Sequence, residues 1–347
     1  MAMTDPLARR ANSALLDVDN LHVRYPLMGA VKAGLLGMKN RFLDAVLDVS
    51  FNLQAGTTLA LVGESGSGKS TLGRAIIGLV PIAGGRVCFQ GEEPLKAGPG
   101  AARSYHRDVA MMFQDPVSSL SPRRTVRALI TEPFVIHGLS KRNLDHEAQR
   151  LLALVGLPKD FAGRYPHQLS GGQARRVGVA RAVALLPKLI IADEPTAGLD
   201  VSVQGEILNL MTRLQRELGL TYLIITHNLA VVRHVSDETA IMYMGRFVEH
   251  GPTADIFDHA AHPYTIGLLA AQPKPDPDKR REYVALMGEV PSLARRPSGC
   301  EFHTRCPRAQ DICRRQSPNV YRLAPHHIHR CYFPATSDGG LHRNGGA

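Results

Sequence analysis

The pattern of apolar and polar residues changes repeatedly along the chain between strand-like and helix-like spacing. Short apolar runs predict buried strands, and they lie at 59–62, 189–191 and 221–225. Alternation over 13–25 predicts an edge strand, and this pattern resumes at 46–51. Spacings of three and four residues predict helices at 72–77, 147–154 and 203–218. Strands that alternate with helices in this way predict an α/β fold with a mostly parallel sheet.

Three stretches depart from this alternation and indicate the domain organisation. Residues from about 120 to 186 have a helical pattern that breaks at 156–158, so helices are predicted between two strand-rich parts. A Gly-rich, basic insertion spans about 26–44, and the Pro-rich stretch 272–277 resembles a stiff linker. After about 250 the composition shifts to Pro, His, Arg and Cys. We predict a main domain over 13–250, with a helical subdomain at about 115–186, and an extension over 251–335.

A phosphate-binding loop follows the predicted strand at 59–62. Residues 63–70 match G-x-x-x-x-G-K-[ST] without a mismatch, and the helix predicted behind them completes the required context. Backbone N–H groups and a helix N-terminus suit phosphate oxygens, Lys69 suits the β- and γ-phosphates, and Ser70 suits Mg²⁺. The predicted nucleotide-binding residues here are Gly63, Glu64, Ser65, Gly66, Ser67, Gly68, Lys69, Ser70 and Thr71.

Two carboxylates follow the buried strand predicted at 189–191. Asp193 is expected to ligate Mg²⁺, directly or through water, and Glu194 to deprotonate an attacking water. Because Pro195 follows, the alternative is that the pair forms an ordinary turn or helix cap.

Composition and charge narrow the class of protein. The 347 residues are 44% hydrophobic and carry a formal charge of +10, which favours an anionic partner such as nucleotide, nucleic acid or an anionic membrane surface. No apolar run approaches the roughly 18 to 20 residues that cross a bilayer, and no signal-peptide core is present. We therefore expect a cytosolic chain.

Beyond the loop and the carboxylates, the order of motifs resembles the ATP-binding-cassette (ABC) family. The segment Leu169, Ser170, Gly171, Gly172 and Gln173 is similar to the family signature, which contacts ATP bound to the opposite subunit; in isolation it would predict only a turn. The resemblance implies that Gln114 reaches Mg²⁺ and the lytic water and that its surroundings touch the membrane partner. It further implies that Asp200 crosses a dimer interface, that His227 contacts the γ-phosphate, and that Tyr25 stacks on adenine.

The chain resembles most closely the ATPases of oligopeptide and dipeptide importers, through the insertion after Tyr25, residues 200–204, 262–264 and a four-cysteine tail. This resemblance implies an ATPase at the cytoplasmic face of the inner membrane. Its partners would be a second related or identical ATPase subunit, two transmembrane permease subunits and, indirectly, a solute-binding protein, with no nucleic acid. Importers of nickel, glutathione or sugar share this ATPase type. A rival of another class is an ABC ATPase that acts on DNA or the ribosome.

Four of the five cysteines lie close together near the C-terminus, at Cys300, Cys306, Cys313 and Cys331. Clustered thiolates in a reducing compartment predict a metal centre, either zinc or an iron–sulfur cluster, with His326, His327 and His329 as alternative ligands. The absence of a C-x-x-C pair favours the larger cluster. Some members of the resembled family hold a 4Fe-4S cluster in this tail, which implies the same here.

Overall fold

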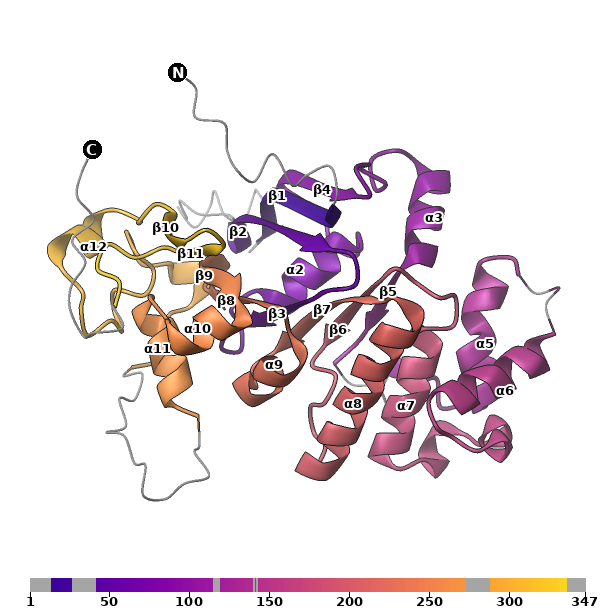
Figure 1. Cartoon of the computed structure of the whole chain (residues 1–347). Coiled ribbons are helices and arrows are strands. Elements are labelled where there is room, and N and C mark those ends of the chain that lie inside the picture. Colours follow the sequence, from indigo (N-terminus) through magenta and orange to yellow (C-terminus); the bar gives the residue numbers. More distant parts are fainter. Residues whose placement is uncertain are drawn as a thin grey trace, which may run out of the picture. The chain divides into compact units, whose positions relative to one another are not determined.

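The computed structural model describes residues 14–26, 42–114, 119–139, 141, 143–272 and 288–335 (Figure 1). The chain forms two compact units, and each combines segments that are distant in sequence. The first comprises Met1–Asp17, Asn52–Thr58 and Val87–Ile225, and the second Val18–Phe51, Leu59–Arg86 and Thr226–Ala347. Most of the insertion predicted at 26–44 and of the linker predicted at 272–277 lies outside the described residues.

The first unit contains a parallel ladder of three strands. Strand β6 (Leu189–Asp193) pairs on one side with β5 (Val109–Met112) and on the other with β7 (Thr221–Thr226), so that Leu189 lies opposite both Val109 and Thr221. All five residues of β6 are buried, as an uninterrupted apolar strand requires. Helices α3 (Pro99–Asp108) and α8 (Val201–Leu218) belong to the same unit. The predicted parallel α/β fold is confirmed.

Helices dominate the middle of the first unit, as the sequence predicts. They are α5 (Val126–Ile136), α6 (Leu144–Leu154) and α7 (Gly171–Ala182), with the 3-10 turns η1 (Lys159–Gly163) and η2 (Pro166–Gln168). Thr125 and Asn143 cap α5 and α6 by accepting backbone N–H groups. Gly156 adopts a φ of 70° just after α6, which explains the break in the pattern there.

The second unit contains a mixed ladder in the order β10, β11, β9, β8, β3. Strand β3 (Thr58–Val62) runs parallel to β8 (Glu238–Tyr243), whereas β9 (Arg246–Pro252), β11 (His327–His329) and β10 (Tyr321–Ala324) add antiparallel neighbours. Within the described residues, the helices of this unit are α2 (Lys69–Ile76), α9 (Leu229–Val235), α10 (Thr253–Asp258), α11 (Pro263–Ala270), η3 (Leu293–Arg295) and α12 (Asp311–Arg315). Among the helices in the described ranges, none is both long and apolar enough to cross a bilayer.

Strand β1 (Ala14–Pro26) corrects one expectation. It lies between β2 (Phe42–Gln54) and β4 (Gly84–Phe89) in a three-stranded sheet, so it is central and not an edge strand. Its alternation is real in two parts, because Leu16 and Val18, and then Leu21 and Val23, are almost completely buried. Alternation reports which face of a strand is buried and carries no information about the number of neighbouring strands.

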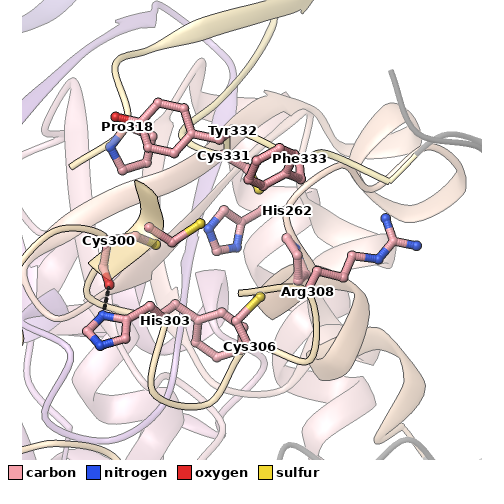
Figure 2. Close-up of a pocket in the computed structure, with 12 residues that line it drawn as sticks. His262, Cys300, His303, Cys306, Arg308, Pro318, Cys331, Tyr332 and Phe333 are labelled. Carbon is pink, nitrogen blue, oxygen red and sulfur yellow. Dashed lines mark hydrogen bonds between the residues drawn. The ribbon is translucent and has the colours of Figure 1, made fainter. Parts of the chain in front are cut away.

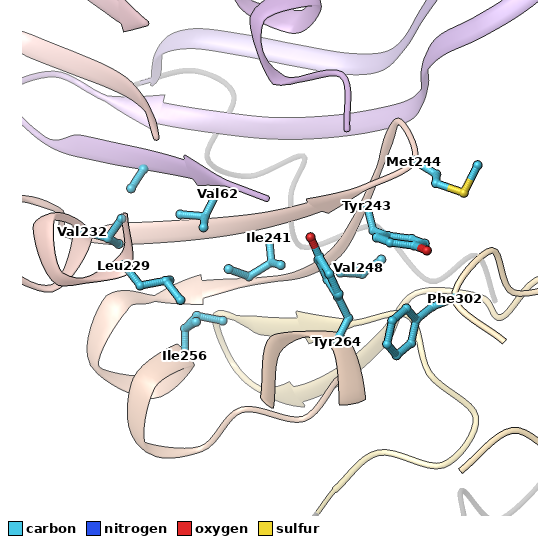
Figure 3. Close-up of a cluster of buried hydrophobic side chains, with 11 residues drawn as sticks. Val62, Leu229, Val232, Ile241, Tyr243, Met244, Val248, Ile256, Tyr264 and Phe302 are labelled. Atoms are coloured by element: carbon cyan, nitrogen blue, oxygen red, sulfur yellow. The ribbon is translucent and has the colours of Figure 1, made fainter. Parts of the chain in front are cut away.

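A cluster of buried side chains joins residues after position 250 to strands β3 and β8 (Figure 3). Tyr243 of β8 stacks edge-on against Phe302, with ring centroids 5.3 Å apart, and Tyr264 of α11 lies 4.7 Å from Tyr243. Aromatic pairs at these separations add to the burial of their area. The C-terminal region is therefore built on the core of the second unit.

A buried carboxylate fixes the start of α11. The side chain of Glu249 accepts the N–H groups of Ala261 (2.7 Å) and His262 (2.9 Å) and pairs with Nε2 of His327 at 2.7 Å. His262 in turn caps α11, because its Nδ1 accepts the N–H of Tyr264 at 3.1 Å. That nitrogen must be unprotonated to accept, and burial lowers the pKa of His262 from 6.5 to about 4.

This depressed pKa predicts acid sensitivity. Between about pH 6.5 and pH 4 the unfolded chain protonates His262 and the folded chain does not, so the free energy of unfolding should fall as pH falls through this window. His262→Asn keeps a capping acceptor without a titrating group and should flatten this part of the profile, measured by urea unfolding at stepped pH. His259→Asn, at an exposed position three residues away, is the control. A variant His262→Asn with the wild-type slope would contradict the interpretation.

Candidate nucleotide-binding site

The loop between β3 and α2 is shaped by glycines that no other residue could replace without displacement. A Cβ on Gly63 would lie 2.2 Å from the carbonyl oxygen of Met242, and one on Gly68 would lie 2.3 Å from that of Ala45. Gly68 also adopts a φ of 105°, outside the range that L side chains tolerate. The loop therefore packs directly against backbone, as a phosphate-binding turn does.

Backbone hydrogen bonds connect this loop to the turn between β8 and β9, and that turn to β2. The N–H of Gly245, in the turn between β8 and β9, donates to the carbonyl of Ser67 at 2.8 Å. The carbonyl of Gly245 accepts the N–H of Leu47 in β2, also at 2.8 Å. Because both bonds run between backbone groups, this support depends little on the identity of the flanking side chains.

Lys69 lies inside the loop with its ammonium group surrounded by oxygens. Its Nζ donates to the carbonyls of Gly63 (2.7 Å) and Glu64 (2.8 Å), and Ser67 Oγ lies at 3.3 Å. Ser65 and Gly66 are exposed, whereas Ser70 and Thr71 are half-buried in the first turn of α2. A helix N-terminus beside a fixed cation favours a bound anion, so these residues fit the triphosphate of a nucleotide.

The two predicted carboxylates lie in the first unit and differ in environment. Asp193 is the last residue of β6 and is 1% exposed, whereas Glu194 is half-buried. Glu194 adopts a φ of 49°, and its N–H donates to the carbonyl of Ile225 at 2.8 Å. A left-handed conformation is strained for a side chain other than glycine and often accompanies a functional position. The strand end thus fixes the direction in which the Glu194 side chain leaves the backbone.

Ser170 is the N-cap of α7 and forms a capping box with Gln173. Its Oγ accepts the N–H of Gln173 at 3.3 Å, while Oε1 of Gln173 accepts the N–H of Ser170 at 3.0 Å. A Cβ on Gly172 would lie 2.8 Å from Val203, so this segment packs against α8. Asp200 caps α8 in the same way, by accepting the N–H of Val203 at 2.9 Å.

Arg175 is a residue that sequence reasoning missed. It is 3% exposed and donates to two backbone carbonyls, that of Ala197 at 2.8 Å and that of Gln114 at 3.3 Å. It thereby ties the exposed residue Gln114 to the segment that follows Glu194. A buried arginine interrupts the hydrophobic spacing of α7, so the sequence pattern held no signal for it.

The two remaining predicted residues lie in the second unit. His227 is exposed directly after β7, and the next residue, Asn228, caps α9 by accepting the N–H of Ala230 at 3.0 Å. Tyr25 is half-buried near the end of β1. Each of these side chains therefore follows or ends a strand, where α/β proteins place ligand-binding groups.

Comparisons with known proteins agree with this geometry. Residues 46–197 match the family described as ABC transporter, and residues 248–313 match the oligopeptide/dipeptide transporter C-terminal region. The oligopeptide transport ATP-binding protein AppF of Bacillus subtilis is 46% identical over 87% of this chain and 93% of its own length. The chain belongs to the ABC transporter ATP-binding family. The dipeptide transport ATP-binding protein DppF of Escherichia coli is 44% identical over 88% of this chain and 90% of its own.

A solved ABC cassette provides the structural counterpart. The dimeric, post-hydrolysis structure of the cassette MJ0796, bound to ADP and Pi, matches with a TM-score of 0.59 and 27% identity, and covers 69% of this chain and 98% of that one. As a member of the ABC family, the chain is expected to use ATP and Mg²⁺.

The predicted iron–sulfur cluster, with zinc as its alternative, is wrong. Over the part of the chain that the structure describes, no group of three or more His, Cys, Asp or Glu side chains could hold a metal ion. The four cysteines instead line a small pocket with His262, His303 and Tyr332 (Figure 2). Burial raises the pKa of Cys300 and of Cys331 to about 12, which favours the neutral thiol over the thiolate in this structure.

These cysteines act as small apolar residues. Cys300 and Cys306 pack against the core cluster that contains Phe302, and the N–H of Cys300 donates to the carbonyl of Cys313 at 2.8 Å. Free cysteines are among the most frequently buried residue types. The histidines named as alternative ligands have other positions: His327 pairs with Glu249, His329 is buried, and His326 is exposed.

Proposed function

We propose that this chain hydrolyses ATP to drive peptide import, as the ATP-binding subunit of an oligopeptide or dipeptide ABC transporter at the cytoplasmic face of the membrane. The observation that carries the proposal is the glycine-shaped loop around Lys69, in a chain that matches an oligopeptide transport ATP-binding protein over 87% of its length. The C-terminal match at 248–313 favours peptide over metal or sugar as cargo. We assign 13–250 to the ATPase domain, 115–186 to its helical part and 251–335 to the extension.

Each residue has a separate role in this proposal. Lys69 and the loop N–H groups bind the phosphates, and Tyr25 stacks on the adenine. Ser70, Asp193 and Gln114 would hold Mg²⁺, which when bound neutralises phosphate charge. Glu194 accepts a proton from the attacking water, and His227 donates a hydrogen bond to the γ-phosphate.

We further propose that the chain acts as a dimer with a second ATPase subunit, identical or related. The dimeric structure of MJ0796 supports this arrangement. Residues 170–173 would then contact ATP bound to the partner, and Asp200 would cross the interface. Because each complete site would draw on two chains, the monomer should hydrolyse ATP poorly.

A groove in the first unit suits the permease subunits. It lies between α3, β5, α5 and α7, and Phe113 and Ile136, which line it, are 42% and 60% exposed. Arg107 adds a positive charge at the rim, whereas burial and nearby cations lower the pKa of His137 and favour its neutral form. We assign this groove to a permease segment with an apolar face and an acidic residue.

Ile136→Asp tests the groove. A buried carboxylate opposes an apolar contact, so permease recovered with a tagged chain should fall roughly tenfold. Val135→Asp is the matched control, because Val135 is 54% exposed on the same helix but does not line the groove. Equal recovery of permease with both variants would contradict the assignment.

Glu194→Gln tests the proton acceptor. The substitution keeps the shape of the side chain and removes its basicity, so ATP turnover should fall by roughly 10² or more while MgATP binding persists. Turnover is measured as phosphate release by the assembled transporter. Glu206→Gln changes an exposed glutamate that pairs with Arg176 and should leave turnover unchanged. Near-normal turnover of Glu194→Gln would exclude this role.

Deletion of the gene tests the cargo. A strain that lacks it should fail to take up labelled di- or oligopeptides while uptake of free amino acids persists, and the cloned gene should restore peptide uptake. Unchanged peptide uptake in a strain without another peptide importer would contradict the assigned cargo.

A further inference from the structure

The C-terminal region contacts the phosphate loop at Glu64. The hydroxyl of Tyr264 accepts the N–H of Glu64 at 2.9 Å. The guanidinium of Arg305 donates to both carboxylate oxygens of Glu64, from Nη1 at 2.7 Å and from Nη2 at 3.0 Å. The backbone and the side chain of Glu64 are therefore both held by residues after position 250.

The contact between Arg305 and Glu64 is a bidentate ion pair, which is stronger than a single neutral hydrogen bond. Two parallel, charge-assisted hydrogen bonds fix both the distance and the orientation of a carboxylate. The Arg305 side chain is 4% exposed and that of Glu64 is 26% exposed, so solvent screens this pair less than a surface pair. Removal of one partner would leave a poorly solvated charge on the other.

Glu64 also contacts the phosphate-binding lysine, so the position of Glu64 affects that of Lys69. Its carbonyl oxygen accepts a hydrogen bond from Lys69 Nζ at 2.8 Å. The three polar parts of Glu64 thus contact three residues: its N–H contacts Tyr264, its carboxylate contacts Arg305 and its carbonyl contacts Lys69. A shift of Glu64 would move an oxygen that anchors the ammonium group.

Tyr264 and Arg305 are themselves rigidly held. Tyr264 is fully buried, and its ring lies 4.7 Å from that of Tyr243 and 5.3 Å from that of Phe302. Arg305 lies over Tyr243 and Phe302, with its guanidinium carbon 5.9 and 6.0 Å from the ring centroids. Groups with so little freedom can hold a loop at small entropic cost.

We propose that Tyr264 and Arg305 are positioning residues for nucleotide binding. They hold Glu64 in place, and the carbonyl of Glu64 in turn holds the ammonium group of Lys69 where it can bind the phosphates of ATP. The C-terminal region would thereby act on ATP affinity as well as on folding. This inference rests on the proposed function, since it concerns the same nucleotide site.

Equilibrium binding of a fluorescent ATP analogue, mant-ATP with Mg²⁺, to the full-length chain tests the inference. Arg305→Gln should raise the Kd roughly tenfold, because it removes a charged hydrogen-bonded pair. Tyr264→Phe keeps the packed ring but loses the acceptor oxygen and should raise the Kd roughly threefold. Arg315→Gln is the matched control: it breaks an exposed pair with Asp311 in the same region and should bind as the wild type does.

A charge swap separates positioning from folding. Arg305→Glu places two carboxylates together and should weaken binding further, whereas the double variant Glu64→Arg, Arg305→Glu restores an opposite-charge pair and should recover at least part of the affinity. If Arg305 acted on folding alone, its substitution would lower the thermal midpoint of the nucleotide-free chain, and the charge swap would restore no affinity. In the assembled transporter, Arg305→Gln should raise KM for ATP more than it lowers kcat.

Two experimental results would overturn this inference alone, and a third would also overturn the proposed function. Equal mant-ATP affinity of the wild type and Arg305→Gln overturns the inference, as does a folded double variant that binds no better than Arg305→Glu. Failure of the wild-type chain itself to bind mant-ATP overturns the proposed function and this inference with it.

Discussion

A buried carboxylate requires hydrogen-bond donors in place of water. In the second unit, the carboxylate of Glu249 has three such donors. It is 1% exposed, and its donors come from the residues that precede α11 and from β11. Because the cost of leaving such a charge unsatisfied is several kcal/mol, the start of α11 and strand β11 are held at β9. The position of Tyr264, two residues after His262, follows from this one buried group.

The phosphate loop was predictable because its signal is local. Eight consecutive residues specify the turn, the lysine and the helix start, and the flanking apolar run specifies β3. The strands β6 and β7 were predictable for the same reason. The partners of the loop were not, since Tyr264 lies 200 residues and Arg305 241 residues from Glu64. A single sequence holds no periodicity that links residues at such separations, and only the packed core of the second unit brings them together.

The cysteines show where a local signal misleads. Their number and spacing favoured a metal, but spacing along the chain does not determine whether a sulfur is ionised. Cys300 and Cys306 pack with the core cluster beside Phe302, and burial disfavours the thiolate. An apolar environment thus turns the same residue type from a ligand into a small hydrophobic side chain. The assignment of β1 to an edge failed for a related reason, because burial of one face is compatible with neighbours on both sides.

At Ser170 two interpretations competed, a helix cap and a nucleotide contact, and the hydroxyl group can satisfy both. Its oxygen accepts the N–H of Gln173, which uses one lone pair. The hydroxyl proton remains available to donate, and Ser170 is exposed to a ligand that approaches the N-terminus of α7. The capping bond also restricts the side-chain rotamer, so it aims the hydroxyl along the end of the helix, where the partial positive charge favours an anion. Capping thus fixes the direction of a hydrogen-bond donor at a helix start that contains two glycines.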